Sequence, residues 1–272
     1  MKFDMGQAWT DAVALLSKNR DLVVILAAVF LFLPSLALGV LAPTTELEAI
    51  MEVNPDGFQE AAAAYAAESW PYMLAYLLFS FVGTLAILAL LGRQQRPTVG
   101  EAIAIGFKTL VPYLLASLIT GLIVGFVVAV LVAIGSIAGA AAAALLGFVA
   151  FFAVVFLFFR LILIGPIMAI DEVLNPIRAI GRSWNLVKGN TRYVAAFMIL
   201  LWIALIVLSI VGGMIFGVIG ALAPAGSIAT WVTALFEALI GAIGSAVFLA
   251  VYAAIHRQLS SGAPEQVSKT FE

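Results

Sequence analysis

The hydrophobic pattern of the chain consists of six long apolar runs separated by short polar segments. A helix needs about 20 predominantly apolar residues to cross the hydrocarbon core of a bilayer. Runs of that kind cover residues 22–42, 72–92, 112–135, 141–165, 193–217 and 229–255. They are continuous and lack the two-residue alternation of a membrane strand, which excludes a transmembrane barrel. The pattern predicts an all-α polytopic membrane protein with six transmembrane helices.

The third and fourth runs are separated only by a stretch of small residues from Gly135 to Ala144. One very long bent helix is the alternative interpretation. The combined length of the two runs is nearly that of two bilayers, so two spans joined by a tight turn are predicted.

Three polar stretches, each followed by a pair of spans, resemble one another. Their aligned positions are Ala8, Ala102 and Ala179; the small residues Ala12, Gly106 and Ser183; and the bulky residues Val13, Phe107 and Trp184. This alignment predicts three repeats of an interfacial amphipathic helix plus two spans, over residues 1–92, 93–170 and 171–258. Helical patterning alone also produces similarity this short. In either case the chain reads as one membrane domain, residues 1–272, ending in a polar tail at 259–272.

The third amphipathic stretch has the clearest helical signature. Asn175 is suited to capping a helix, Pro176 to its first position, and Gly189 to its end. Apolar residues recur at spacings of three and four, and basic or polar residues occupy the other side. The first set is Leu174, Ile177, Ile180, Trp184 and Val187, and the second is Arg178, Arg182 and Asn185. A basic amphipathic helix of this kind lies in the headgroup layer of a membrane.

Composition supports a lipid environment and removes several chemistries. Apolar residues make up 64% of the 272 residues and charged residues 10%, whereas soluble domains are about half apolar and a quarter charged. The absence of cysteine excludes disulfides, thiol catalysis and thiolate metal sites. His256 is the only histidine, and beside Arg257 at the end of the last run it is expected to be an interface residue.

The placement of charge predicts the orientation. Twelve of the thirteen basic residues fall in the four segments on one side of the predicted spans, and the segment between spans one and two carries six acidic residues and no base. Loops rich in Lys and Arg stay in the cytoplasm. We therefore expect both termini to be cytoplasmic and the acidic segment, from Glu46 to Glu68, to lie outside.

A pattern between residues 160 and 190 resembles a known family. It comprises Arg160, Pro166, Asp171-Glu172, Ala179, Arg182-Ser183-Trp184 and Gly189-Asn190. These positions resemble the glycerophosphoryl diester phosphodiesterase membrane-domain family and are similar to the YciC-like bacterial inner-membrane proteins. The resemblance implies a multi-span protein of the bacterial inner membrane, involved in lipid or envelope homeostasis. Fused relatives carry a soluble phosphodiesterase barrel, which needs about 250 residues. No segment of that kind follows Arg257, so no enzymatic activity is expected.

The candidate binding residues are basic. Arg178, Arg182, Lys188 and Arg192 are expected to contact anionic lipid headgroups, since each base near an anionic surface contributes about 1 kcal/mol. The alternative is an internal network of ion pairs with Asp171 and Glu172. Arg160, near the same side of span four, is expected either to bind lipid phosphate, to extend to the interface, or to anchor to one of those two acids.

Glu237, inside the sixth run, is the candidate intramembrane acid. Charged residues in spans are functional candidates by default, and Glu237 would bind a proton, a cation or a polar substrate. The alternative is a hydrogen-bonded packing residue.

Taken together, these patterns favour a non-enzymatic membrane protein that contacts anionic lipids. A small transporter or channel for a lipid-like or weakly polar substrate, with a pathway near Glu237, is the second hypothesis, and a membrane assembly scaffold is the third. No cofactor, metal or nucleic acid is expected, and a homo-oligomer is allowed.

Overall fold

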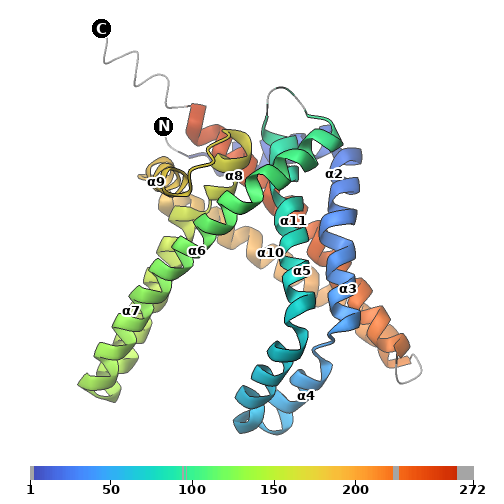
Figure 1. The fold of residues 1–272 in the computed structure, drawn as a ribbon, viewed down its shortest axis with the longest axis vertical. Coiled ribbons are helices and arrows are strands. Elements are labelled where there is room, and N and C mark those ends of the chain that lie inside the picture. The colour runs from blue at the N-terminus through green and yellow to red at the C-terminus, as the bar shows by residue number, and fades with distance from the viewer. Residues whose placement is uncertain (1–2, 94, 96, 223–226, 262–272) are drawn as a thin grey trace.

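The computed structural model describes residues 3–261 except 94, 96 and 223–226, and these residues form helices connected by short turns (Figure 1). The helices are α1 (Met5–Lys18), α2 (Arg20–Ala27), the π-helix η1 (Ala28–Phe32), α3 (Leu33–Leu41), α4 (Thr45–Val53), the 3₁₀ turn η2 (Pro55–Gly57), α5 (Phe58–Gly92), α6 (Val99–Ala138), α7 (Ala140–Leu161), α8 (Ile164–Ile170), α9 (Pro176–Val187), α10 (Thr191–Leu222) and α11 (Ser227–Ser261).

The six predicted spans are confirmed by helix length and hydropathy. The segments long and apolar enough to cross a membrane are Arg20–Leu41, Pro55–Gly92, Val99–Ile137, Ala140–Ile170, Thr191–Val218 and Thr230–Ser261. Each contains one of the predicted runs almost entirely. The acidic segment between the first two predicted runs is helical as well. It forms α4 and the first turns of α5, which begins before its apolar run.

The tight turn between spans three and four is also confirmed. Gly139 alone separates α6 from α7, with φ 94° and ψ 170°, a conformation open essentially to glycine only. The two helices return antiparallel, and Gly135 lies so close to Ala143 that an added Cβ would be 2.9 Å from the Ala143 Cα. This hairpin diverges from the other helices toward the end opposite the N-terminus (Figure 1).

The expected second interfacial helix does not form a separate element. Residues 100–110 are the first turns of α6, which continues through Pro112 to Ala138. A proline inside a helix removes one backbone hydrogen bond but leaves the apolar run on both sides intact. The start of α6 is fixed by a capping box, in which Thr98 and Glu101 each accept from the other's backbone N–H.

The core lies in the half of the bundle nearer the N-terminus. The last turns of α5, from Val82 to Leu91, are buried except for the half-buried Thr84, and the short helix α8 is buried along its whole length except Ile170. The C-terminal turns of α11, from Leu249 to His256, complete this core apart from the half-buried Tyr252. By contrast, most large apolar side chains of α6, α7 and α10 are exposed, as expected for surfaces in contact with lipid.

Candidate functional site at the basic end

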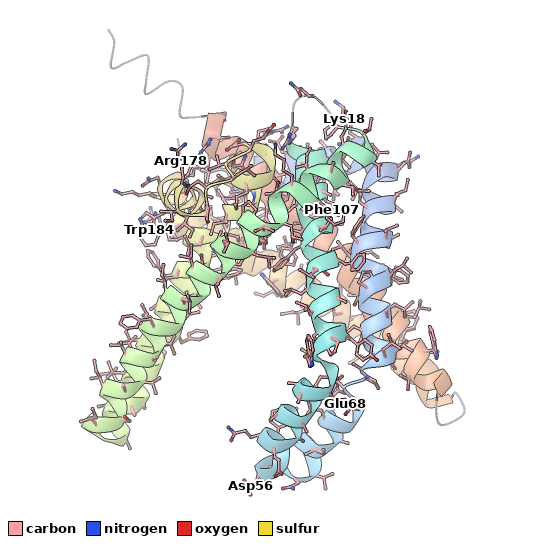
Figure 2. All side chains as sticks on the ribbon, viewed as in Figure 1. Lys18, Asp56, Glu68, Phe107, Arg178 and Trp184 are labelled. Carbon is pink, nitrogen blue, oxygen red and sulfur yellow. The ribbon has the colours of Figure 1, made fainter. Side chains whose placement is uncertain are left out.

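The charged residues divide between two ends of the bundle. Lys18 and Arg178 lie at one end, together with Phe107 and Trp184, whereas Asp56 and Glu68 lie at the opposite end (Figure 2). We call the first the basic end and the second the acidic end. The predicted separation of charge along the bundle is therefore present in three dimensions. Which end faces the cytoplasm stays a prediction.

Helix α9 forms at the basic end as the sequence predicts. The Asn175 side-chain oxygen accepts a hydrogen bond from the Arg178 N–H at 3.0 Å, and Pro176 occupies the first turn. Gly189 follows the helix with φ 87°, the left-handed conformation that commonly ends a helix.

The face of α9 that contacts the protein differs from the predicted apolar face. Ala179, Ser183 and Val187 are fully buried against the protein, while Ile177 is 72% exposed. The predicted set therefore divides, with Val187 in the core and Ile177 on the outer surface. Sequence periodicity identifies the polar side of a helix, but it does not separate burial in protein from burial in lipid.

Ser183 links α9 by hydrogen bonds to the break between α7 and α8, at residues 162–163. Its hydroxyl donates to the Arg160 carbonyl at 3.0 Å and accepts from the Leu163 N–H at 3.3 Å. A helix that ends inside a protein leaves backbone groups without partners, and this one hydroxyl satisfies a carbonyl on one side of the break and an N–H on the other. The small residue predicted from the repeat alignment thus has a polar role here.

Arg160 contacts neither of the two acids proposed as its anchors. Its Nη1 donates to the Trp184 carbonyl at 2.8 Å. Its guanidinium lies 4.5 Å from the centroid of the Trp184 ring and 5.4 Å from that of Phe156, within range of cation–π attraction. The predicted partners are therefore wrong, because the end of α7 places this side chain under α9. The anchoring role of Arg160 stays a prediction.

Asp171 is the charged centre of the basic end. Its Oδ2 lies 2.8 Å from Nη2 of Arg182 and 2.9 Å from Nε2 of His256. The side chain of His256 is only 4% exposed, so it is buried in the protein beside this acid, and its place at the membrane interface stays a prediction. The turn after α8 brings the acid to α11, a contact between residues 85 positions apart that no local pattern reveals.

A second ion pair lies beside the first. Nη1 of Arg93, at the end of α5, is 2.7 Å from Oε1 of Glu172, and its Nε donates to the Ala169 carbonyl at 2.9 Å. Glu172 has φ 57°, a conformation costly for residues other than glycine and sustained only where the surroundings impose it.

These two pairs border a cavity of about 410 Å³ at the basic end. Its charged and polar lining residues are Arg93, Gln95, Asp171, Glu172, His256, Arg257 and Ser260. Arg257 is itself paired with Asp11 of α1 at 2.7 Å. The described residues contain no group of three or more His, Asp or Glu placed to hold a metal ion. The geometry joins α1, α5, α8, α9 and α11 electrostatically.

The five predicted headgroup residues therefore separate into two groups. Arg182 and Arg160 make contacts within the protein, although the Arg182 side chain is itself 42% exposed. Arg178, Lys188 and Arg192 are exposed, and the ion pairs found among the described residues do not include them. Arg192 packs against its neighbour Tyr193, with 4.7 Å between guanidinium carbon and ring centroid. The internal-network alternative applies to Arg182, and the outward arrangement applies to the other three.

Glu237 lies on the outer surface of α11 rather than among the helices. Its side chain is exposed, between Leu235 and Leu239, which are also exposed. Glu48 of α4 is near enough to act on it electrostatically, which places Glu237 toward the acidic end.

Equivalent positions of the predicted repeats have similar burial. Ala8, Ala102 and Ala179 are fully buried, and Ala12, Gly106 and Ser183 are buried at the next aligned position. The bulky residues Val13 and Phe107 are exposed, and Trp184 is half-buried. The three stretches thus use small residues to approach the core closely, although the repeat itself stays a prediction.

These features define a class. The chain is a multi-span α-helical membrane protein with an apolar core and a polar network at the basic end. It belongs to the family described as Domain of unknown function (DUF7847), which matches residues 3–259. None of the curated proteins or solved structures compared with the chain matches it. This family match covers nearly the whole chain. It is a different family from the two that residues 160–190 resemble.

Proposed function

We propose that the protein binds anionic lipid headgroups at its basic end, through α9 and the start of α10, and does so without catalysis. The observation that carries the proposal is the outward arrangement of Arg178, Lys188 and Arg192 beside the exposed Ile177. Exposed bases at the end of the bundle, one of them next to an exposed apolar residue, suit the boundary between headgroups and acyl chains.

The magnitude is sufficient for selective binding. Each base near an anionic membrane surface contributes about 1 kcal/mol, so three contribute about 3 kcal/mol. Because Asp171 is engaged by Arg182 and His256, it does not neutralise these three bases. Because Asp171 is paired inside the protein, it leaves Arg178, Lys188 and Arg192 able to bind phosphate.

The test compares thermal stability in detergent with and without phosphatidylglycerol. Replacing Arg178, Lys188 and Arg192 together by Gln is expected to reduce the stabilisation by added lipid while leaving the Tm without lipid nearly unchanged. The matched control is Arg182→Gln, which is expected to lower the Tm without lipid and keep the lipid response. A triple variant that retains the full response to phosphatidylglycerol contradicts the proposal.

The wider role that we propose is lipid or envelope homeostasis in a bacterial inner membrane, with both termini in the cytoplasm. It is supported by the resemblance of residues 160–190 to the phosphodiesterase membrane-domain and YciC-like families. A transport pathway near Glu237 has less support, because the exposed position of this residue gives it no surrounding ring of polar groups among the described residues. An assembly scaffold remains the third hypothesis.

A further inference from the structure

A separate groove runs along the first and last spans, away from α9. It has a volume of about 580 Å³ and is formed by the end of α1, by α2 and η1, and by the middle of α11. Arg20 is the only charged residue among those that line it, and Ser17 the only other polar one. An apolar groove with polar groups at one end matches the division of a lipid into chain and headgroup.

Small residues make the floor of the groove and large residues make its walls. Ala27 and Ala242 are less than a tenth exposed at the floor, and Ala28 and Ala246 lie beside them. Val24 is 64% exposed and Ile243 is 47% exposed, so each rises as a ridge on one side. Small, little-exposed residues between large exposed ones leave an apolar depression in this surface.

The wall contains the π-helix. The Leu33 N–H donates to the Ala28 carbonyl, five residues back, and Ala28 and Phe32 line the groove. Pro34 has no N–H to offer the preceding turn, which accounts for a wider turn just before it. Such single π turns occur frequently at functional sites.

The dimensions of the groove match one leaflet. From Arg20 to Phe32 the chain advances 12 residues of helix, or about 18 Å at 1.5 Å per residue. One leaflet of a hydrocarbon core about 30 Å thick is about 15 Å deep. The groove therefore begins at the surface of the basic end and runs to about the middle of the bilayer.

The mouth carries the charge that a phospholipid headgroup requires. Lys18 lies at the basic end (Figure 2), two residues before Arg20. Asp21 is 3.3 Å from Arg20, with both side chains about four-fifths exposed (79% and 84%), and such a surface pair is weak. Two bases against one acid leave positive charge above an apolar channel.

We infer that this groove is a binding site for one acyl chain of an anionic phospholipid from the leaflet at the basic end. The lipid phosphate lies at Lys18 and Arg20, and the chain lies on the alanine floor between Val24 and Ile243. The site shares no residue with α9, so it can be tested independently of the headgroup site proposed there.

The experiment counts bound lipid by native mass spectrometry on the full chain in detergent, with dioleoyl phosphatidylglycerol as the probe. The background is the variant with Arg178, Lys188 and Arg192 replaced by Gln, which removes the α9 site. Ala246→Phe fills the floor and is expected to weaken the apparent Kd about tenfold, while Ala204→Phe on the exposed face of α10 has no effect. Loss of binding in the background itself, before any groove change, assigns the lipid to α9 and overturns the groove site.

A pair of substitutions at the mouth tests the headgroup contact without changing the apolar residues of the groove. Lys18→Gln with Arg20→Gln is expected to weaken the apparent Kd about fivefold or more, and Lys108→Gln on α6 serves as its control. Dihexanoyl phosphatidylglycerol, which has the same headgroup and short chains, is expected not to compete. Unchanged phosphatidylglycerol binding in Ala246→Phe overturns the inference, and so does equally tight binding of dioleoyl phosphatidylcholine. If Ala246→Phe does not fold, unchanged binding in the Lys18→Gln, Arg20→Gln variant overturns it.

Discussion

At the scale of single residues, the basic end depends on a few polar side chains that serve two partners each. Asp171 pairs with both Arg182 and His256, and Ser183 binds both sides of the break between α7 and α8. Buried polar groups are stable only when their hydrogen-bonding capacity is satisfied. Removing one such side chain therefore affects several helices together.

The first prediction concerns Asp171→Asn. Asparagine retains the size of the side chain but removes the charge that Arg182 and His256 share, and the expected loss is about 2 kcal/mol of unfolding free energy. Thermal or denaturant unfolding in detergent measures it. Glu172→Gln is the control, because that side chain is 58% exposed and a surface ion pair contributes at most about 1 kcal/mol. Equal effects of the two substitutions contradict the central role of Asp171.

The second residue-scale prediction separates the transport hypothesis from the lipid hypothesis. Glu237→Gln and Glu237→Leu are both expected to leave folding and phosphatidylglycerol binding unchanged, because the side chain lies on the outer surface of α11. Growth of cells that rely on the protein provides the functional readout. If both variants fold and both fail to support growth, a titrating acid is required and the transport hypothesis gains the support it lacks.

At the scale of elements, the α6–α7 hairpin depends on a single turn residue. Gly139 adopts φ 94° and ψ 170°, where a side chain adds strain of about 1–3 kcal/mol. Its neighbours in the turn are small, which lets the two helices approach each other closely.

We therefore expect Gly139→Val to lower the unfolding free energy by about 1–3 kcal/mol through backbone strain. Gly147→Ala is the matched control, since an added Cβ there meets nothing within 4 Å and alanine favours a helix. Unfolding curves of the two variants in detergent provide the comparison. A Gly139→Val protein as stable as the wild type would show that the turn adopts another conformation.

At the scale of the whole molecule, charge and burial follow the same axis. The acidic residues Asp56 and Glu68 lie at one end, before the apolar run of α5, whereas Lys18 and Arg178 lie at the other end, where the buried core is. This arrangement predicts a single orientation in the membrane, with the basic end in the cytoplasm.

Single-cysteine labelling tests that orientation cleanly because the chain contains no cysteine. A cysteine at Asp56 is expected to react with a membrane-impermeant reagent while the membrane is intact. A cysteine at Lys18 is expected to react only after permeabilisation. The reverse pattern at both positions contradicts the predicted orientation.

The sequence by itself determined the class, the number of spans, a tight turn between residues 135 and 144, and the boundaries of α9. These features follow from local properties, namely the length of apolar runs, the residues suited to helix caps and the conformational freedom of glycine. The separation of acidic from basic segments was equally predictable, because successive segments between spans lie on alternate sides of the membrane.

Only the tertiary structure decided which polar groups meet. Asp171 and His256 are 85 residues apart and Arg93 and Glu172 are 79 apart, and an ion pair needs a precise approach that hydrophobic periodicity does not encode. The structure likewise divided the bases of α9, since both are exposed but Arg182 is paired with Asp171 and Arg178 is in none of the ion pairs found among the described residues. Both occupy the polar side of one helix, and only the neighbouring turn after α8 distinguishes them.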